Sequence, residues 1–346
     1  MNYQFKTLLC TGVGNTIQGG ADIWVNHFLK EVWPLLPEKK TWRLLVDSKK
    51  PLDFETNSLP KGLQYHFHFD DVEKTKKWLE ESVVIHSLHS HYHKRDHIWH
   101  YEDKFGTIFV HAYPPEMNEI ITKNNELNRL QHTTKVDVNF FDDYLVTFKK
   151  RVWIGNNKSK ILEKFPFETY EFPNFYEFKH NRPLTTHVTN GKVGFASRIE
   201  SRKCFHWMDG IEGYALTSKR DIQNLKDTSH YTFIKTQIYQ WSPNIHHQFM
   251  TKNWGIFHGA YFKEPFGYSI FQAVDYGKLP ILNKDWAVEV DYKYRASTKN
   301  EFNKCIKQIL KDSYKTQEFE FNKLKNYMKQ FDNKNQWIEQ VKSIVL

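Results

Sequence analysis

Short apolar runs and amphipathic stretches alternate along the whole chain. Runs such as Phe5–Cys10 and Leu279–Leu282 have the length of buried strands, whereas residues 72–81 carry apolar side chains at helical spacing. This alternation predicts an α/β protein with parallel sheets. We expect further strands at 43–46, 83–86, 107–111, 143–147, 192–197, 213–217, 231–235, 254–258 and 288–292, and further helices at 23–33, 116–131, 158–164, 222–226, 244–252, 267–276 and 299–312.

The alternation is interrupted once, near residues 166–183. Pro166, Pro173 and Pro183 lie there with the polar run 179–183, a composition typical of a connector between domains. A length of 346 residues also favours two domains, each with its own core. We therefore predict two doubly wound domains facing a central cleft. The expected bounds are 1–174 and 175–328, followed by a helix at 329–346 that packs back onto the body.

Composition limits the class of protein. No apolar stretch approaches the roughly 20 residues that cross a bilayer, and no basic and apolar leader follows Met1, which predicts a soluble intracellular protein. The 3 cysteines have no C-x-x-C spacing, which argues against disulfides or a thiolate zinc site. A formal charge of +9 suggests a polyanionic partner, either nucleic acid or an anionic membrane face.

The run from Lys263 to Leu282 combines an acid, a Pro-Phe-Gly turn, a helix start and a buried strand. Glu264 can accept two hydroxyl hydrogen bonds. The backbone N–H groups after Pro265 lie at the start of the predicted helix, where unpaired donors and the positive end of the dipole favour a phosphate. Gly277 ends that helix. This order is the one expected of a pocket for a sugar diphosphate.

Two cations follow the predicted strand 192–197. Arg198 and Lys203 come just beyond its carboxyl end, which is where α/β proteins bind ligands. A guanidinium and an ammonium side by side suit a diphosphate whose negative charge grows as it leaves. Ordinary surface cations on a solvated turn would show the same spacing.

Together the two segments resemble the nucleotide-sugar domain of GT-B glycosyltransferases of the retaining, family-four type. The likeness lies in Arg198 followed by Lys203, then Glu264-Pro-Phe-Gly267 before the helix. The resemblance implies a two-domain enzyme that transfers a sugar, with retention, from a nucleoside-diphosphate sugar. The 1–174 domain would bind the acceptor and the 175–328 domain the donor. UDP-sugar is the expected co-substrate, and no cofactor or metal is implied.

Three earlier segments extend the resemblance with lower specificity. The run from Gln18 to Asp22 is similar to the glycine loop that opens the first domain. Residues 108–111 are similar to the strand that ends in an active-site histidine, and the run from Phe172 to Asn174 resembles the tripeptide that enters the interdomain linker. The resemblance therefore covers most of the chain.

The family's residue roles are carried over position by position. The resemblance assigns Arg198 and Lys203 to the leaving diphosphate and Glu264, the first acid of an E-x7-E motif, to the transferred sugar. The second acid, which grips the ribose, is replaced by Gln272, and the resemblance assigns this amide to the ribose. Its amide has one acceptor oxygen in place of a bidentate carboxylate, so the affinity or identity of the nucleotide changes. The other assigned residues are His111 beside the reacting centre and, on the donor, Gly20, Ser197, Lys219, Phe266 and Gly267.

Residues 86–100 hold six histidines. His89, His91 and His93 would share one face of an extended segment, as metal ligands do, but no cysteine or acid cluster accompanies them and the resembling enzymes are metal-independent. We expect these rings at the acceptor edge, because cations interleaved with aromatics suit nucleic acid. The other residues of this predicted surface are Lys94, Arg95, Trp99, Lys149, Lys150 and Arg151.

Three interpretations of the function remain, and the first two differ in the acceptor. The excess of basic over acidic residues and a loose likeness of residues 210–220 to phage α-glucosyltransferases favour transfer to 5-hydroxymethylcytosine in double-stranded phage DNA. The expected location is then the cytoplasm of an infected bacterium. The alternative acceptor is a bacterial surface polysaccharide or lipid-linked glycan. A third reading, which the loss of the acid at Gln272 supports, is a nucleic-acid-binding protein of this fold without activity.

Overall fold

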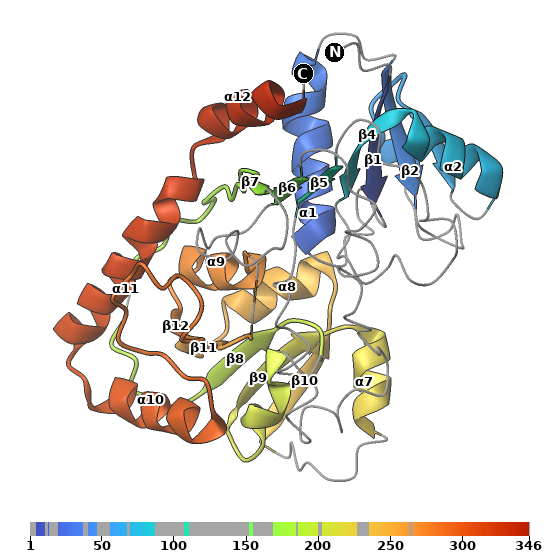
Figure 1. Ribbon diagram of the computed structural model, residues 1–346. Helices are drawn as coiled ribbons and strands as arrows, with labels where there is room; N and C mark the ends of the chain where they lie inside the picture. Colours follow the sequence, from blue (N-terminus) through green and yellow to red (C-terminus); the bar gives the residue numbers. More distant parts are fainter. Residues whose placement is uncertain are drawn as a thin grey trace. The chain divides into compact units, whose positions relative to one another are not determined.

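The chain forms two compact units in the computed structural model (Figure 1). The structure describes residues 5–10, 13, 20–36, 41–46, 56–67, 70–86, 107–110, 152–154, 169–184, 186–199, 203–226, 235–262, 264 and 266–345. The first unit holds the described residues of 5–175 together with 333–345, and the second holds those of 176–332. Within the described residues, the chain passes from the first unit to the second at 175/176 and returns to the first at 332/333.

The first unit is built on a parallel sheet whose described strands lie in the order β3-β2-β1-β4-β5-β6-β7. The strands are β1 (Phe5–Cys10), β2 (Trp42–Val46), β3 (Gln64–Phe67), β4 (Ser82–His86), β5 (Thr107–Phe109), β6 (Val152–Ile154) and β7 (Thr169–Glu171). Its helices are α1 (Gly20–His27), a π-helical turn Phe28–Val32, the 3-10 turns Trp33–Leu35 and Thr56–Ser58, α2 (Val72–Glu80) and α12 (Lys334–Val345).

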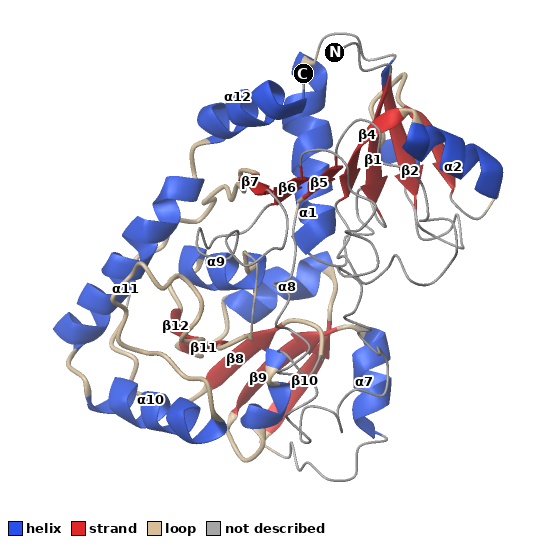
Figure 2. Ribbon diagram, viewed as in Figure 1, coloured by secondary structure: helices blue, strands red, loops and turns tan. Residues whose placement is uncertain are grey.

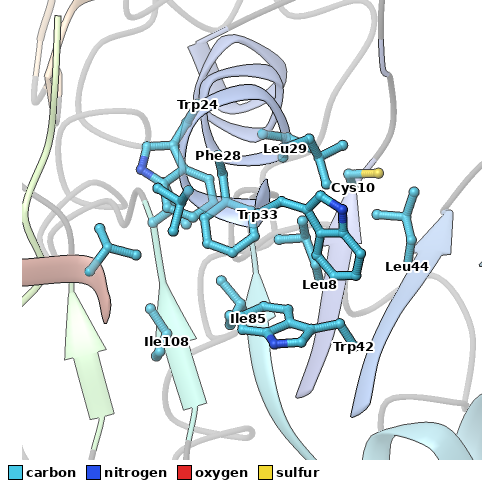
Figure 3. Close-up of a cluster of buried hydrophobic side chains, with 14 of the residues drawn as sticks. Leu8, Cys10, Trp24, Phe28, Leu29, Trp33, Trp42, Leu44, Ile85 and Ile108 are labelled. Carbon is cyan, nitrogen blue, oxygen red and sulfur yellow. The ribbon is translucent and has the colours of Figure 1, made fainter. Parts of the chain in front are cut away.

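Large aromatic side chains fill the core of this unit (Figure 3). Trp24 and Phe28, from α1 and the turn after it, face the apolar side chains of the central strands, among them Leu8 and Ile85. Trp24 stacks on Phe28 with ring centroids 5.2 Å apart, and Phe28 lies 5.2 Å from Trp42. Burying such side chains is worth about 1.5–3 kcal/mol each, so this layer supplies much of the stability of the unit.

The C-terminal helix α12 belongs to the same core. Trp337 stacks on Phe175 at 5.1 Å, and its indole N–H donates to the carbonyl of Pro173 at 3.2 Å. At the start of the helix, the Lys334 ammonium lies 2.6 Å from the Glu31 carboxylate and, as its hydrogen-bond donor, lowers the pKa of Glu31. The end of the chain is thus fastened to the unit that begins it.

The second unit carries a parallel sheet whose described strands lie in the order β10-β9-β8-β11-β12 (Figure 2). The strands are β8 (Val193–Ala196), β9 (Gly213–Thr217), β10 (Thr236–Gln240), β11 (Ile256–Gly259) and β12 (Leu279–Leu282). The helices are the 3-10 helix Phe205–Met208, α7 (Lys219–Lys226), α8 (Pro243–Met250), α9 (Tyr268–Asp275), α10 (Lys299–Lys311), α11 (Tyr314–Met328) and the 3-10 turn Lys329–Phe331.

Several helices begin at a residue whose side chain caps them. Asp71, Ser242 and Thr298 each accept a hydrogen bond from the backbone N–H three residues later, at 2.9, 3.3 and 3.2 Å. Ser313 does the same for α11 at 3.3 Å. Each cap satisfies an N–H group that the helix leaves unpaired and is worth about 1 kcal/mol. The starts of these helices are therefore encoded locally.

The predicted α/β class with parallel sheets is confirmed. Strands β1, β9 and β12 have the predicted bounds. The predicted strand 288–292 is wrong, because the Arg295 guanidinium binds the carbonyls of Trp286, Ala287 and Val290 at 2.5–2.7 Å and holds the segment in turns. In place of the strand predicted at 231–235, the chain forms β10 from Thr236, and residues 231–234 lie outside the described part. The elements predicted at 116–131, 143–147 and 158–164 also lie outside it.

Candidate active site

The order of the second sheet marks where a ligand is expected to bind. The chain runs from β8 outward through β9 to β10, and then returns to the other side of β8 to form β11 and β12. In open parallel sheets, ligands bind outside the carboxyl ends of the strands at such a switch point. The segments that follow β8 and β11 therefore line the expected site, and they contain Arg198, Lys203 and Glu264.

Lys203 and Glu264 meet at this edge. The Lys203 ammonium donates a hydrogen bond to a Glu264 carboxylate oxygen, and the two side chains are only 9% and 12% exposed. The ammonium also lies 4.2 Å from the centre of the Tyr261 ring. Taking two charges out of water is costly. Because both side chains are long and lie at the edge of the sheet, a charged ligand can separate them and replace each one's present partner. The sequence predicted both residues, and the fold joins them.

Glu264 also touches the start of helix α9. Gly267 caps this helix with φ +84°, a left-handed conformation that residues with a Cβ rarely adopt. A Cβ at Gly267 would lie 3.2 Å from Glu264 Cγ and 3.0 Å from Ile270 Cδ1. The glycine therefore lets the acid pack against the helix N-terminus, where the positive end of the dipole attracts anions.

A fully buried tryptophan supports this turn from behind. The indole N–H of Trp286 donates to the carbonyl of Phe266 at 3.2 Å, and Phe266 stacks on Phe271 with centroids 4.4 Å apart. Trp286 is held in turn through its own carbonyl by Arg295. The backbone at Phe266 and Gly267 is thus pinned by side chains from the segment after β12.

The other predicted donor residues lie at several places in the fold. Ser197 extends β8, since its N–H donates to the carbonyl of Leu216 at 3.2 Å, and Arg198 follows it with a half-buried side chain. Lys219 begins α7 and is exposed. Gly20 begins α1 in the first unit. The structure thus brings together Lys203, Glu264 and Gly267.

Gln272 faces the neighbouring helix α8. Its side chain interacts with His246 and counteracts the lowering of the His246 pKa by burial. The next histidine, His247, contacts the Tyr276 hydroxyl through Nδ1 at 2.9 Å. The ribose role of Gln272 stays a prediction, and this helix-to-helix contact is a second role for the same side chain.

The remaining predicted residues lie outside the described part of the chain. They are His111 and the acceptor surface of His89, His91, His93, Lys94, Arg95, Trp99, Lys149, Lys150 and Arg151. Their roles stay predictions. Within the described residues, no cluster of three or more histidine, cysteine or acidic side chains is arranged to hold a metal ion. None of the described helices is both long enough and apolar enough to cross a membrane.

Sequence reasoning missed the residues that hold this site in place. Tyr261 lies under the Lys203 ammonium, Trp286 binds the Phe266 carbonyl, and His258 binds the carbonyl of Cys204, the residue after Lys203. Their spacing in the sequence gives no sign of these contacts, because each one joins segments 20 to 58 residues apart. Only the position of Tyr261 just after a predicted strand could have pointed to it.

The comparisons with known proteins agree with this architecture. No protein-family model and no curated protein matches the sequence. Among solved structures, sucrose-phosphate synthase from Thermosynechococcus elongatus matches with a TM-score of 0.63 and 12% identity, over 98% of each chain. WaaG, a glycosyltransferase involved in lipopolysaccharide biosynthesis, matches with a TM-score of 0.61 and 10% identity, over 98% of this chain and 99% of that one.

A third similar structure holds a sugar nucleotide. It is described as trehalose-6-phosphate from E. coli bound with UDP-2-fluoro glucose, and it matches with a TM-score of 0.56 and 10% identity, over 98% of this chain and 99% of that one. At such low identity the matches establish the fold and not the activity. With two parallel α/β units and matches that span nearly the whole chain, this protein has the fold of the GT-B glycosyltransferases.

Proposed function

We propose that this protein is a glycosyltransferase that moves a sugar, with retention, from a UDP-sugar to an acceptor hydroxyl. The observation that carries the proposal is the paired Lys203 and Glu264 beside the N-terminus of α9, at the switch point of the second sheet. A cation, an acid and a helix start are the groups that a diphosphate joined to a sugar would use. The match to a structure with bound UDP-2-fluoro glucose is consistent with this donor.

Each group has a definite task in this reaction. The bond between the anomeric carbon and the diphosphate oxygen breaks, and the acceptor oxygen forms the new bond to that carbon. Lys203 and Arg198 stabilise the negative charge that develops on the leaving diphosphate. Glu264, released from Lys203, accepts hydrogen bonds from the sugar hydroxyls. The acceptor's proton passes to the departing diphosphate oxygen, so the reaction is balanced without a protein nucleophile.

For the acceptor we propose 5-hydroxymethylcytosine in double-stranded phage DNA, which places the enzyme in the cytoplasm of an infected bacterium. The formal charge of +9 and the basic, aromatic run 86–100 support a polyanionic acceptor. The second candidate is a surface glycan, which the similarity to WaaG, a protein of lipopolysaccharide biosynthesis, favours. A protein that binds nucleic acid without turnover is the third outcome, and the retained Lys203–Glu264 pair argues against it.

The test is to incubate the protein with radiolabelled UDP-sugars and with duplex DNA that contains 5-hydroxymethylcytosine, with a lipopolysaccharide core, or with neither acceptor. Transfer that requires the DNA supports the first acceptor, and transfer to a lipopolysaccharide core or hydrolysis alone supports the second. DNA binding with no turnover of any UDP-sugar would overturn the enzymatic proposal.

A matched pair of variants ties the activity to the site. Lys203→Met removes the cation of the buried pair, and we expect turnover to fall by more than tenfold, about 1.4 kcal/mol of transition-state stabilisation. Lys284→Met removes the cation of an exposed pair with Glu301 in the same unit. We expect this control to keep wild-type turnover, because exposed pairs contribute little.

A further inference from the structure

The residue after Lys203 has an unusual backbone. Cys204 has φ +54° and ψ +33°, the left-handed conformation, although it is not a glycine. This conformation costs a residue with a Cβ about 1–2 kcal/mol. Cys204 is fully buried, so the surrounding structure enforces the conformation and solvent does not relax it. Such local strain persists only where neighbouring groups determine it, and it is concentrated at functional sites.

Two hydrogen bonds hold the Cys204 carbonyl. The backbone N–H of Trp207 donates to it at 2.9 Å and closes the first turn of the 3-10 helix Phe205–Met208. The second donor is the imidazole of His258 on β11, whose Nε2 lies 2.9 Å from the same oxygen. Since a carbonyl can only accept, the proton of the neutral ring must be on Nε2. The bond crosses 54 residues of sequence and connects β11 to the segment after β8.

His258 is held by aromatic rings. Its side chain is fully buried and stacks on Trp207 with an interplanar angle of 10°. The centre of its ring lies 4.5 Å from the centre of the Phe302 ring. Burial lowers the pKa of His258 to about 3, so the ring stays neutral at physiological pH. A rigid, neutral ring with its proton on Nε2 is a fixed hydrogen-bond donor. Apolar packing alone would not favour a histidine at this position, because burying a polar ring without a hydrogen bond is costly.

Lys203 is therefore held from both ends by one strand and its following loop. His258 of β11 binds the main chain next to Lys203, while Glu264, in the loop after β11, binds the ammonium. Tyr261 lies between them in sequence and under the ammonium. Because His258 and Glu264 are only six residues apart, any shift of the lysine backbone relative to β11 would pull the ammonium away from its partner.

We propose that His258 is a positioning residue for Lys203. By keeping Cys204 in its left-handed conformation, it places the ammonium where the diphosphate of the donor arrives. The inference rests on the proposed function, and it adds a residue that the E-x7-E and Arg/Lys pattern does not contain. A cation that is already in place stabilises developing charge without reorganisation, and a misplacement of about 1 Å can cost about a hundredfold in rate.

The first test compares His258→Phe with His258→Gln. Phenylalanine keeps the stacking and removes the donor, whereas the glutamine Nε2 can reach the carbonyl. We expect the phenylalanine variant to weaken UDP binding and slow transfer by about tenfold, and the glutamine variant to recover both to within about threefold. His206→Phe is the matched control, since His206 is also a buried histidine and lies in the 3-10 helix that follows Cys204. If His206→Phe loses as much UDP affinity and transfer rate as His258→Phe, or if His258→Gln does not recover them, the inference is wrong.

The second test asks whether His258 acts through Lys203. In the Lys203→Met background, His258→Phe should change UDP affinity by less than about twofold, because the side chain that it positions is absent. A further tenfold loss in that background would show that His258 acts on the fold in general. If the phenylalanine variant does not fold, His258→Met supplies a flexible side chain without a donor for the same cycle.

A third measurement separates this inference from the proposed function. The ¹⁵Nζ resonance of Lys203 can be followed by NMR in the full-length protein without any nucleotide. We expect a slowly exchanging ammonium signal in the wild type and in His258→Gln, and its loss in His258→Phe. If wild-type protein neither binds UDP nor transfers a sugar, the proposed function fails while this signal still tests the positioning. An unchanged signal in His258→Phe would overturn the positioning alone.

Discussion

Helix α9 has a buried carboxylate at each end, and the two are held in opposite ways. Asp275, its last residue, accepts hydrogen bonds from the backbone N–H groups of residues 179, 180 and 181 at 3.2, 3.0 and 2.5 Å. The Tyr176 hydroxyl donates to it at 3.4 Å. Glu264, which precedes the helix, is held by the side-chain ammonium of Lys203.

The difference separates structure from function within one short segment. Backbone donors cannot leave Asp275 without unfolding the segment 176–182, so this acid fastens that segment to the second unit. A lysine ammonium can rotate to another acceptor, so the Glu264 pair can open for a ligand at a modest cost. Both carboxylates are largely withdrawn from solvent, and the kind of partner decides which of them is available for chemistry.

The largest expected effect tests the fixed end of the helix. Asp275→Ala would leave three backbone N–H groups and a hydroxyl without their acceptor, and we expect the free energy of unfolding to fall by about 3 kcal/mol or more. Glu264→Gln keeps an acceptor oxygen for Lys203 and should cost less than half as much. Urea denaturation of both variants measures this. Equal losses would remove the distinction between the two carboxylates.

The next effect concerns acid pH and the buried histidines of the second unit. Burial lowers the pKa of His258 to about 3 and that of His206 to about 4, against about 6.5 for an unfolded histidine. Between these values the unfolded state binds more protons, so this stability is complete above about pH 6.5 and is lost as the pH falls. We expect each of the two histidines to contribute a loss of about 2 kcal/mol from pH 7 to 4.5. His258→Gln should show a shallower slope, and an identical slope would contradict the assignment.

A smaller energy, with a large kinetic effect, is expected at Arg198. Arg198 follows β8 and is assigned, like Lys203, to the ligand and not to the fold. Arg198→Ala should therefore slow sugar transfer by more than tenfold, about 1.4 kcal/mol. The free energy of unfolding should stay nearly unchanged. Steady-state kinetics and urea denaturation on the same preparation provide both values. Unchanged kinetics would remove its role at the diphosphate.

The smallest effect is expected between the two carboxylates, at Gln272. If its side chain reaches the ribose, Gln272→Glu should tighten donor binding by about threefold, because a carboxylate accepts hydrogen bonds more strongly than an amide. Isothermal titration with UDP measures the change. An unaltered dissociation constant, together with a raised pKa of His246, would assign residue 272 to the contact between α8 and α9 instead.

Much of the fold could be predicted because its signals are local. The apolar runs of β1, β9 and β12 and the capping side chains of α2, α8 and α10 act over a few residues. Alternation alone misled at 288–292, where Val288, Val290 and Tyr292 have the spacing of a strand. There the Arg295 guanidinium competes for the carbonyls that a strand would offer to its neighbour.

By itself the sequence determined the α/β alternation, the capped helix starts and the residue types of the candidate site, Arg198, Lys203 and Glu264 among them. Tertiary structure alone decided that Lys203 meets Glu264, that His258 binds the carbonyl of Cys204, and that Trp286 supports Phe266. The physical reason is distance along the chain. A cap or a strand depends on neighbours, whereas these contacts exist only after parallel strands far apart in sequence have paired and their carboxyl ends share one edge.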